Sequence, residues 1–219
     1  MSNYFYSMKN ILSRSPAQAR YLDLLMKPKP AIVIAAGAAG TGKTLLSTMV
    51  GVHKLRQGEV ERLIITRPMV SADEDIGYLP GSLDQKFMPW VRPIYDVLKK
   101  HYSPNEIERL MKSQTIELSP ISFMRGRSFE NCFIICDEVQ NCTARQVLML
   151  LTRIGLNSKL VVTGDPSQHD RDITEVNGLS DLLNRIIVKN TSDDIEVVEL
   201  WEDSIQRHPV VKDIIAMYQ

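Results

Sequence analysis

Short, continuous apolar runs alternate along the chain with longer stretches in which apolar residues recur every three or four positions. The first kind of run is typical of buried strands, and the second spacing is typical of helices with one apolar face. The predicted strands cover residues 31–37, 62–68, 115–121, 132–136, 159–165 and 195–201. The predicted helices cover residues 15–27, 43–58, 90–102, 103–113, 143–155, 178–187 and 208–218.

Capping signals support two of the helix starts. Ser15 is placed to cap the first helix, with Pro16 at its first position and Gln18 three residues after the cap. This is the spacing of a capping box. Ser103 and Glu106 have the same spacing at the start of a later helix.

The order of the elements predicts the fold class. The run CFIIC at residues 132–136 does not alternate between apolar and polar positions, as expected of a central strand covered by helices on both faces. A helix capped by Thr143 and ended by Gly155 is expected to follow it. Strands and helices in this order form a mainly parallel sheet with helices on both faces. No linker interrupts the pattern, so we expect one α/β domain over residues 15–219, with residues 1–14 as an N-terminal extension.

Charge and hydropathy narrow the possible partners. The chain has 26 basic and 26 acidic residues, so its net charge of zero gives no overall attraction to a polyanion. Basic residues are dense in residues 1–30 and in MRGR at 124–127, which could bind phosphate locally or form solvated surface. No apolar run approaches the roughly 20 residues that cross a bilayer, and the N-terminus is too polar for a secretory signal. We expect a cytoplasmic protein without a membrane segment.

The three cysteines, Cys132, Cys136 and Cys142, lie within a short segment. They form no CxxC pair, and no histidine follows at zinc-finger spacing. We therefore expect Cys132 and Cys136 to be reduced, buried strand residues rather than metal ligands.

The sequence GAAGTGKT at residues 37–44 lies between a predicted strand and a predicted helix. It matches the P-loop, in which loop N–H groups and the helix N-terminus surround the phosphates of a nucleotide. Lys43 would span the β- and γ-phosphates, and the Thr44 hydroxyl would ligate Mg2+. A glycine-rich turn without a ligand would explain neither Lys43 nor Thr44. The expected ATP-binding residues are Gly37, Ala38, Ala39, Gly40, Thr41, Gly42, Lys43 and Thr44.

Two adjacent acids follow the predicted central strand. Asp137 lies at the strand end, where open α/β sheets bind their ligands, and would hold Mg2+. Glu138 would orient and deprotonate the water that attacks the γ-phosphate, which favours hydrolysis over binding alone. The alternative is a pair of acids that caps a helix.

A third polar group follows the next predicted strand, in VVTGDPSQ. Thr163, Asp165 and Gln168 would lie beside the γ-phosphate, where Gln168 could respond to its presence. A β-turn around GDPS would explain the glycine, aspartate and proline without a ligand, but it would not explain Gln168.

These motifs, together with several further stretches, resemble the PhoH-like ATPases, a family named for phosphate starvation. The matching stretches are GAAGTGKT, LIITRPMV, IGYLPGSLDQKFMPWVRPIYD, SFMRGRSFENCFIICDEVQN, LTRIGLNSKLVVTGDPSQ and RHPVV. The resemblance implies a RecA-like P-loop core similar to that of superfamily 1 helicases. Some members of the family add a nuclease domain and unwind and cleave RNA. We expect neither that domain nor RNA cleavage in these 219 residues, and no further domain before residue 15.

The resemblance also implies roles for individual residues. Gln18 would contact adenine, unless it serves only as the capping-box glutamine. The implied nucleic-acid contacts are Thr66, Arg67, Arg125 and Arg127. Their arginines could instead pair with the acidic residues 73–75 at the surface.

An arginine finger would add the fixed cation that transition-state charge requires. Arg207 is the first candidate for it and Arg153 the second. The resemblance further implies a homo-oligomer, with a hexameric ring as one arrangement, in which the finger acts across a subunit boundary.

Taken together, these observations favour an ATPase that hydrolyses MgATP and is coupled to single-stranded RNA or DNA. Aromatic residues make up only 6 % of the chain, so strand binding would be mostly to backbone phosphate. The candidates for base stacking are Tyr78, Phe87, Trp90 and Phe123. One alternative is a nucleotide-dependent switch or scaffold, which would not need Glu138. Another is a small-molecule P-loop kinase of the thymidine-kinase type, but the paired cysteines of its zinc-binding lasso are missing.

Overall fold

The computed structural model describes residues 13–68, 83–168, 177–189, 192–201 and 217. The centre of the fold is a six-stranded sheet in which every strand pair is parallel. The strand order is β3-β2-β4-β5-β1-β6. The strands are β1 (Ile32–Ala36), β2 (Arg62–Arg67), β3 (Ile116–Pro120), β4 (Cys132–Cys136), β5 (Lys159–Gly164) and β6 (Ile195–Glu199).

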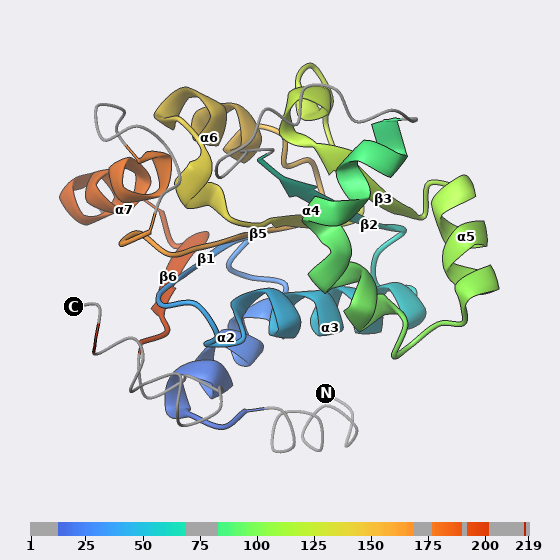
Figure 1. The fold of residues 1–219 in the computed structure, drawn as a ribbon. Helices are drawn as coiled ribbons and strands as arrows, with labels where there is room; N and C mark the ends of the chain where they lie inside the picture. Colours follow the sequence, from blue (N-terminus) through green and yellow to red (C-terminus); the bar gives the residue numbers. More distant parts are fainter. Residues whose placement is uncertain (1–12, 69–82, 169–176, 190–191, 202–216, 218–219) are drawn as a thin grey trace.

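Helices cover both faces of this sheet, so the expected fold class is confirmed (Figure 1). The face formed by residues such as Val33 and Ile135 packs against α2 (Pro16–Met26), α3 (Lys43–Arg56), α4 (Leu83–Leu98) and α5 (Pro104–Lys112). The opposite face packs against the short helices η2 (Ile121–Met124) and η3 (Val139–Asn141) and against α6 (Ala144–Leu151) and α7 (Gly178–Lys189). In the described part of the chain, no helix combines the length and apolar character needed to cross a bilayer.

Burial on both faces explains why the strand sequences are apolar throughout. All five residues of β4 are buried, and its phenylalanine and isoleucines alternate between the two cores. The expected burial of Cys132 and Cys136 in a strand is therefore confirmed, and both thiols are free.

Helix boundaries agree with the capping signals in most places. Ser15 caps α2 by accepting the N–H of Gln18, and Ser103 forms a reciprocal capping box with Glu106. Three helix boundaries differ from the prediction by at least four residues. Helix α4 runs from Leu83 to Leu98 rather than over 90–102, and α6 ends at Leu151 rather than at residue 155. The predicted helix 208–218 and the extension 1–14 lie almost entirely outside the described residues.

Helix α2 is tied to the amino end of the sheet. The buried Lys159 ammonium, at the start of β5, donates to the carbonyls of Leu24, at 2.9 Å, and of Pro30. The Lys54 ammonium of α3 donates to the carbonyl of Met26 at 2.9 Å. These bonds satisfy carbonyls at and after the C-terminal end of α2 and hold that end in place. The N-terminal end of α2 contacts the loop that follows β1, through Gln18 and Thr41.

The strand order places three functional segments side by side. Strands β1, β5 and β4 are neighbours, and in a parallel sheet their carboxyl ends meet at one edge. The P-loop follows β1, and Asp137 follows β4, so one strand separates them. This is the arrangement of a RecA-like P-loop core.

Candidate nucleotide-binding site

The loop between β1 and α3 has the backbone of a phosphate-binding turn. Gly40 and Gly42 have φ angles of 85° and 88°, which glycine adopts without steric cost. At Gly37, a Cβ would lie 1.9 Å from the carbonyl oxygen of Leu200, the residue after β6. The chain therefore requires glycine at Gly37 because β6 passes too close for a side chain.

Lys43 directs its charge into this loop. Its ammonium donates to the carbonyls of Gly37 at 2.6 Å and Ala38 at 2.7 Å, and only 8 % of the residue is exposed. The positive charge is thus held within the curve of the loop, where a phosphate group would be bound.

Gln18 supports the loop from α2. Its amide nitrogen donates to the carbonyl of Thr41 at 3.0 Å, and its amide oxygen accepts the N–H of Arg14 at 2.7 Å. The residue is only 2 % exposed and does not line the pocket described below. The neighbouring Tyr21 hydroxyl donates to the Lys43 carbonyl at 3.3 Å, and burial raises the pKa of this phenol.

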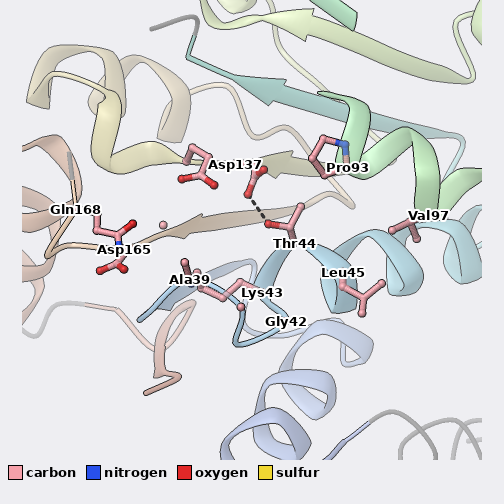
Figure 2. A pocket seen from close by; sticks show the side chains of 13 residues that line it. Ala39, Gly42, Lys43, Thr44, Leu45, Pro93, Val97, Asp137, Asp165 and Gln168 are labelled. Atoms are coloured by element: carbon pink, nitrogen blue, oxygen red, sulfur yellow. Dashed lines mark hydrogen bonds between the residues drawn. The ribbon is translucent and has the colours of Figure 1, made fainter. Parts of the chain in front are cut away.

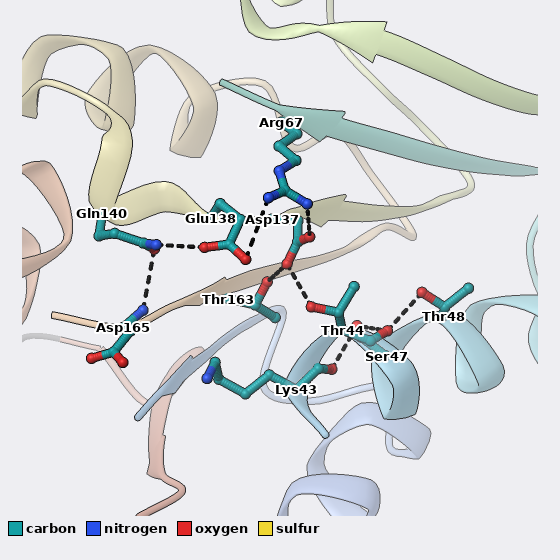
Figure 3. Close-up of polar contacts among 10 residues, drawn as sticks. All are labelled: Lys43, Thr44, Ser47, Thr48, Arg67, Asp137, Glu138, Gln140, Thr163 and Asp165. Atoms are coloured by element: carbon teal, nitrogen blue, oxygen red, sulfur yellow. Dashed lines mark hydrogen bonds and ion pairs between the residues drawn. The ribbon is translucent and has the colours of Figure 1, made fainter. Parts of the chain in front are cut away.

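Asp137 lies opposite the P-loop and accepts hydrogen bonds from the start of α3 and from the end of β5 (Figure 3). Its Oδ1 accepts from the Thr44 hydroxyl at 2.7 Å and from the Thr163 hydroxyl at 2.5 Å. Only 2 % of Asp137 is exposed. A threonine hydroxyl and a carboxylate at this distance are the oxygen donors that Mg2+ prefers, and the pocket leaves room for the waters that Mg2+ keeps. The residues present therefore fit a magnesium site formed by Thr44 and Asp137.

Glu138 has an unusual backbone conformation. Its φ of 55° and ψ of 42° place a non-glycine residue in the left-handed region, which costs about 1–3 kcal/mol. Its carboxylate accepts a hydrogen bond from the Gln140 amide and lies 3.6 Å from the Arg67 guanidinium. The same guanidinium lies 3.6 Å from Asp137 Oδ2. Arg67 thus neutralises both acids at once (Figure 3).

A pocket of about 370 Å3 lies between the P-loop and this acid pair (Figure 2). Asp165 and Gln168 of the predicted third group form part of its wall. A β-turn is present, but it covers residues 165–168 rather than GDPS at 164–167, because the Gln168 N–H donates to the Asp165 carbonyl at 3.2 Å. Gln168 is therefore part of the turn as well as of the pocket wall. Asp165 is 3 % exposed, and its Oδ2 has no hydrogen-bond partner among the described residues.

Several residues of this site escaped the sequence analysis. Pro93 and Val97 of α4 line the pocket, although nothing in their pattern distinguishes them from ordinary helix residues. Gln140 donates to Glu138 and accepts the Asp165 N–H at 3.1 Å, so it links two walls of the site. In the sequence, only its position two residues after Glu138 could have indicated that Gln140 belongs to the site.

The four predicted nucleic-acid contacts have different environments. Thr66 is fully buried, so it presents no surface to a strand. Arg67 pairs with the acid pair, and Arg127 forms a two-pronged ion pair with Glu117, with one contact at 2.9 Å. Only Arg125 is exposed and has no ion pair among the described residues.

Of the two candidate arginine fingers, the structure describes only Arg153, which does not line the pocket. The Arg153 guanidinium donates to the carbonyls of Met149 at 3.0 Å and Arg127 at 2.9 Å. Arg207 lies outside the described residues, as do Tyr78 and the acidic residues 73–75. The side chain of Phe87 is also outside the described part.

Known proteins resemble the chain over most of its length. The family model described as PhoH-like protein matches residues 10–219. A PhoH-like protein of Mycobacterium tuberculosis is 42 % identical over 213 residues, covering 96 % of this chain and 58 % of that protein. One from Bacillus subtilis is 39 % identical over 210 residues, covering 96 % and 64 %. The chain thus spans about three fifths of the length of these relatives.

A solved structure also resembles the fold. The crystal structure of Pif1 helicase from Candida albicans superposes with a TM-score of 0.47 at 18 % identity, covering 94 % of this chain and 43 % of that one. The family assignment depends on the sequence matches and agrees with the P-loop and RecA-like strand order described above. The chain belongs to the PhoH-like protein family.

Proposed function

We propose that the chain binds MgATP in the pocket between the P-loop and the acid pair and hydrolyses it. We further propose that turnover is coupled to binding of single-stranded nucleic acid, RNA or DNA. The observation that carries the proposal is the position of Glu138. This residue has a strained backbone, which structures retain mostly at functional sites, and it follows the Asp137 carboxylate that Thr44 contacts.

Each group of the pocket has a role in this reaction. The P-loop N–H groups and Lys43 would bind the phosphates, and Thr44 with Asp137 would hold Mg2+. The bound metal supplies positive charge that offsets the charge of the phosphates. Glu138 would accept a proton from water as the water oxygen bonds to the γ-phosphorus and the bond to ADP breaks.

Arg67 and Gln140 would set the position of the Glu138 carboxylate. Arg67 contacts Oε1 of the carboxylate, and Gln140 contacts Oε2. Gln140 also accepts the Asp165 N–H. If the segment that carries Asp165 and Gln168 moved, the Gln140 side chain would therefore shift the Glu138 carboxylate. This link supports a role for Gln168 in responding to the γ-phosphate.

Coupling to a nucleic-acid strand is supported by the helicase-like motifs and by the RecA-like strand order. The finger role of Arg207, a homo-oligomer or hexameric ring, and a cytoplasmic location are parts of the same proposal.

The test is steady-state ATP hydrolysis with and without single-stranded RNA and DNA, at two salt concentrations. Glu138→Gln should lower turnover about 100-fold or more, while ATP affinity stays within a few-fold of wild type. Lys43→Ala should instead weaken ATP binding. Salt-sensitive stimulation of the wild type by one polymer would support the coupling. Hydrolysis by Glu138→Gln at the wild-type rate would refute the assignment of the base.

A further inference from the structure

A second cavity, of about 800 Å3, lies along α6 and shares no residue with the P-loop pocket. Residues of the segment 121–126 form one wall, and α6 with its flanking residues forms the other. We call this cavity the α6 groove. Its lining includes Arg125, Arg145 and Arg153 but no aspartate or glutamate. In a chain with a net charge of zero, the groove is therefore a local concentration of positive charge.

The three arginines differ in how they are held. The Arg153 guanidinium donates to backbone carbonyls of α6 and of the loop at Arg127, which ties the two walls together. Arg125 and Arg145 are exposed, and neither has an ion pair or hydrogen bond in the part of the chain that the structure describes. Both are thus available to bind an anion.

The groove also offers apolar surface beside these charges. Leu148 lines it and is 63 % exposed. Phe123 does not line the groove, but it lies in the chain between Ser122 and Arg125, which do, and it is 52 % exposed. Its neighbours Ile121 and Met124 are buried and anchor η2. Unpaired arginines on the same short segment as an exposed aromatic ring are a combination that suits single-stranded nucleic acids, with phosphates bound by arginine and bases stacked on the ring.

We propose that the α6 groove binds the backbone of single-stranded nucleic acid through Arg125 and Arg145, with Phe123 contacting a base. This inference depends on the proposed coupling and gives it a location. It replaces Thr66, Arg67 and Arg127 as contacts, because these side chains are buried or paired with acids. Helix α6 begins six residues after Glu138, with η3 between them, so a strand bound here would contact the next helix along the chain from the acid pair.

The test is fluorescence anisotropy with labelled 12-nucleotide oligo-U and oligo-dT at 50 and 200 mM salt. The groove variant is Arg125→Ala/Arg145→Ala. The control, Arg56→Ala/Arg109→Ala, also removes two exposed arginines, but from α3 and α5. Helix α5 packs beside the edge strand β3, away from α6 (Figure 1). Equal melting temperatures of both variants would establish that neither fold is disturbed.

If the two arginines each contact one phosphate, they contribute about −1.4 to the slope of log affinity against log salt. Between 50 and 200 mM salt this corresponds to a loss of about sevenfold in affinity, which the groove variant should lack and the control should retain. At 50 mM salt the groove variant should bind more weakly than the control. A difference between the U and dT series would identify which polymer the groove accepts.

The other outcomes distinguish the proposed nucleic-acid coupling from its proposed location in the α6 groove. A wild type that binds neither polymer at 50 mM salt would refute the proposed coupling itself. A wild type that binds while the groove variant binds equally well would overturn only the location. An oligo-glutamate peptide that loses affinity in the groove variant when oligonucleotides do not would make the groove a site for acidic protein segments. A changed mass by light scattering with unchanged oligonucleotide affinity would make it a contact between copies of the chain.

Discussion

Arg67 offers the sharpest test of the site's electrostatics. Its guanidinium lies 3.6 Å from Asp137 and 3.6 Å from Glu138, which corresponds to about 4–5 kcal/mol of attraction per pair at an effective dielectric constant of about 20. Desolvation offsets most of this attraction, but removing the cation leaves two adjacent acids, one of them 2 % exposed. We expect Arg67→Gln to lower the free energy of unfolding by about 2–4 kcal/mol, or the melting temperature by roughly 4–16 °C.

The matched control is Arg185→Gln. Arg185 pairs with Asp181 at 2.7 Å, a shorter distance, but its side chain is 65 % exposed. Water and salt screen this pair, so its loss should cost less than about 1 kcal/mol. Thermal and urea unfolding of both variants would measure the difference. Arg67→Lys keeps the positive charge, so its free energy of unfolding should lie between those of Arg67→Gln and the wild type.

A double-mutant cycle identifies the partner. In a Glu138→Gln background the cost of Arg67→Gln should fall by about 0.5–3 kcal/mol, because one of the two unpaired acids is already neutral. MgATP should also reduce the difference in free energy of unfolding between Arg67→Gln and the wild type, since a bound cation would replace the missing positive charge. An Arg67→Gln variant with wild-type stability that loses oligonucleotide binding would refute this reasoning and make Arg67 a nucleic-acid contact.

Three further predictions concern residues away from the acid pair. Gln18→Ala should weaken ATP and GTP binding by the same factor, because support of the P-loop does not depend on the base; a selective loss for ATP would show that Gln18 contacts adenine. Burial lowers the pKa of Lys159 to about 8. Between about pH 8 and 10 the unfolded chain therefore binds more protons at this residue than the folded chain does. The free energy of unfolding should accordingly rise with pH over this range. Urea unfolding at pH 7 and pH 9.5 should show this rise in the wild type and not in Lys159→Met, and equal pH slopes would contradict it. Burial raises the pKa of Cys132 to about 11 and also raises that of Cys136, so a thiol reagent at pH 8.5 should label no cysteine of the native chain and all three in urea.

The strands could be predicted because their environment is nearly uniform. Helices cover both faces, so an apolar run such as residues 132–136 has few other places to lie in a chain of this size. Helix α4 begins seven residues earlier than predicted. Pro89 lies inside it, one residue before the predicted start, and Pro93 lies inside both the predicted and the observed helix. Each proline removes one helical hydrogen bond, and the helix continues through both.

The end of α6 shows why a glycine is an ambiguous signal. The Thr152 hydroxyl and the Arg153 guanidinium bond to carbonyls of the last turn, which ends the helix at Leu151. Gly155 serves another purpose, because a Cβ there would lie 2.7 Å from the carbonyl oxygen of Phe129. Sequence shows that a glycine is present, but not which close contact requires it.

Charged partners distant in sequence were the hardest to predict. Arg67 and the acid pair are 70 residues apart, and only the pairing of β2 with β4 brings them together. Arg127 meets Glu117 across a loop in the same way. Motif analysis identified these arginines as charged residues near strand ends but could not separate those that neutralise acids from those that face solvent.

The balance of charge in the pocket connects these findings. Among the described residues of the pocket and those that contact them, three acids, Asp137, Glu138 and Asp165, face two cations, Lys43 and Arg67. A triphosphate entering alone would meet this excess of negative charge. A divalent cation held by Thr44 and Asp137 would reverse the sign of the excess. The same acids that would supply a base beside the γ-phosphate therefore make the pocket favour a nucleotide that arrives with its metal.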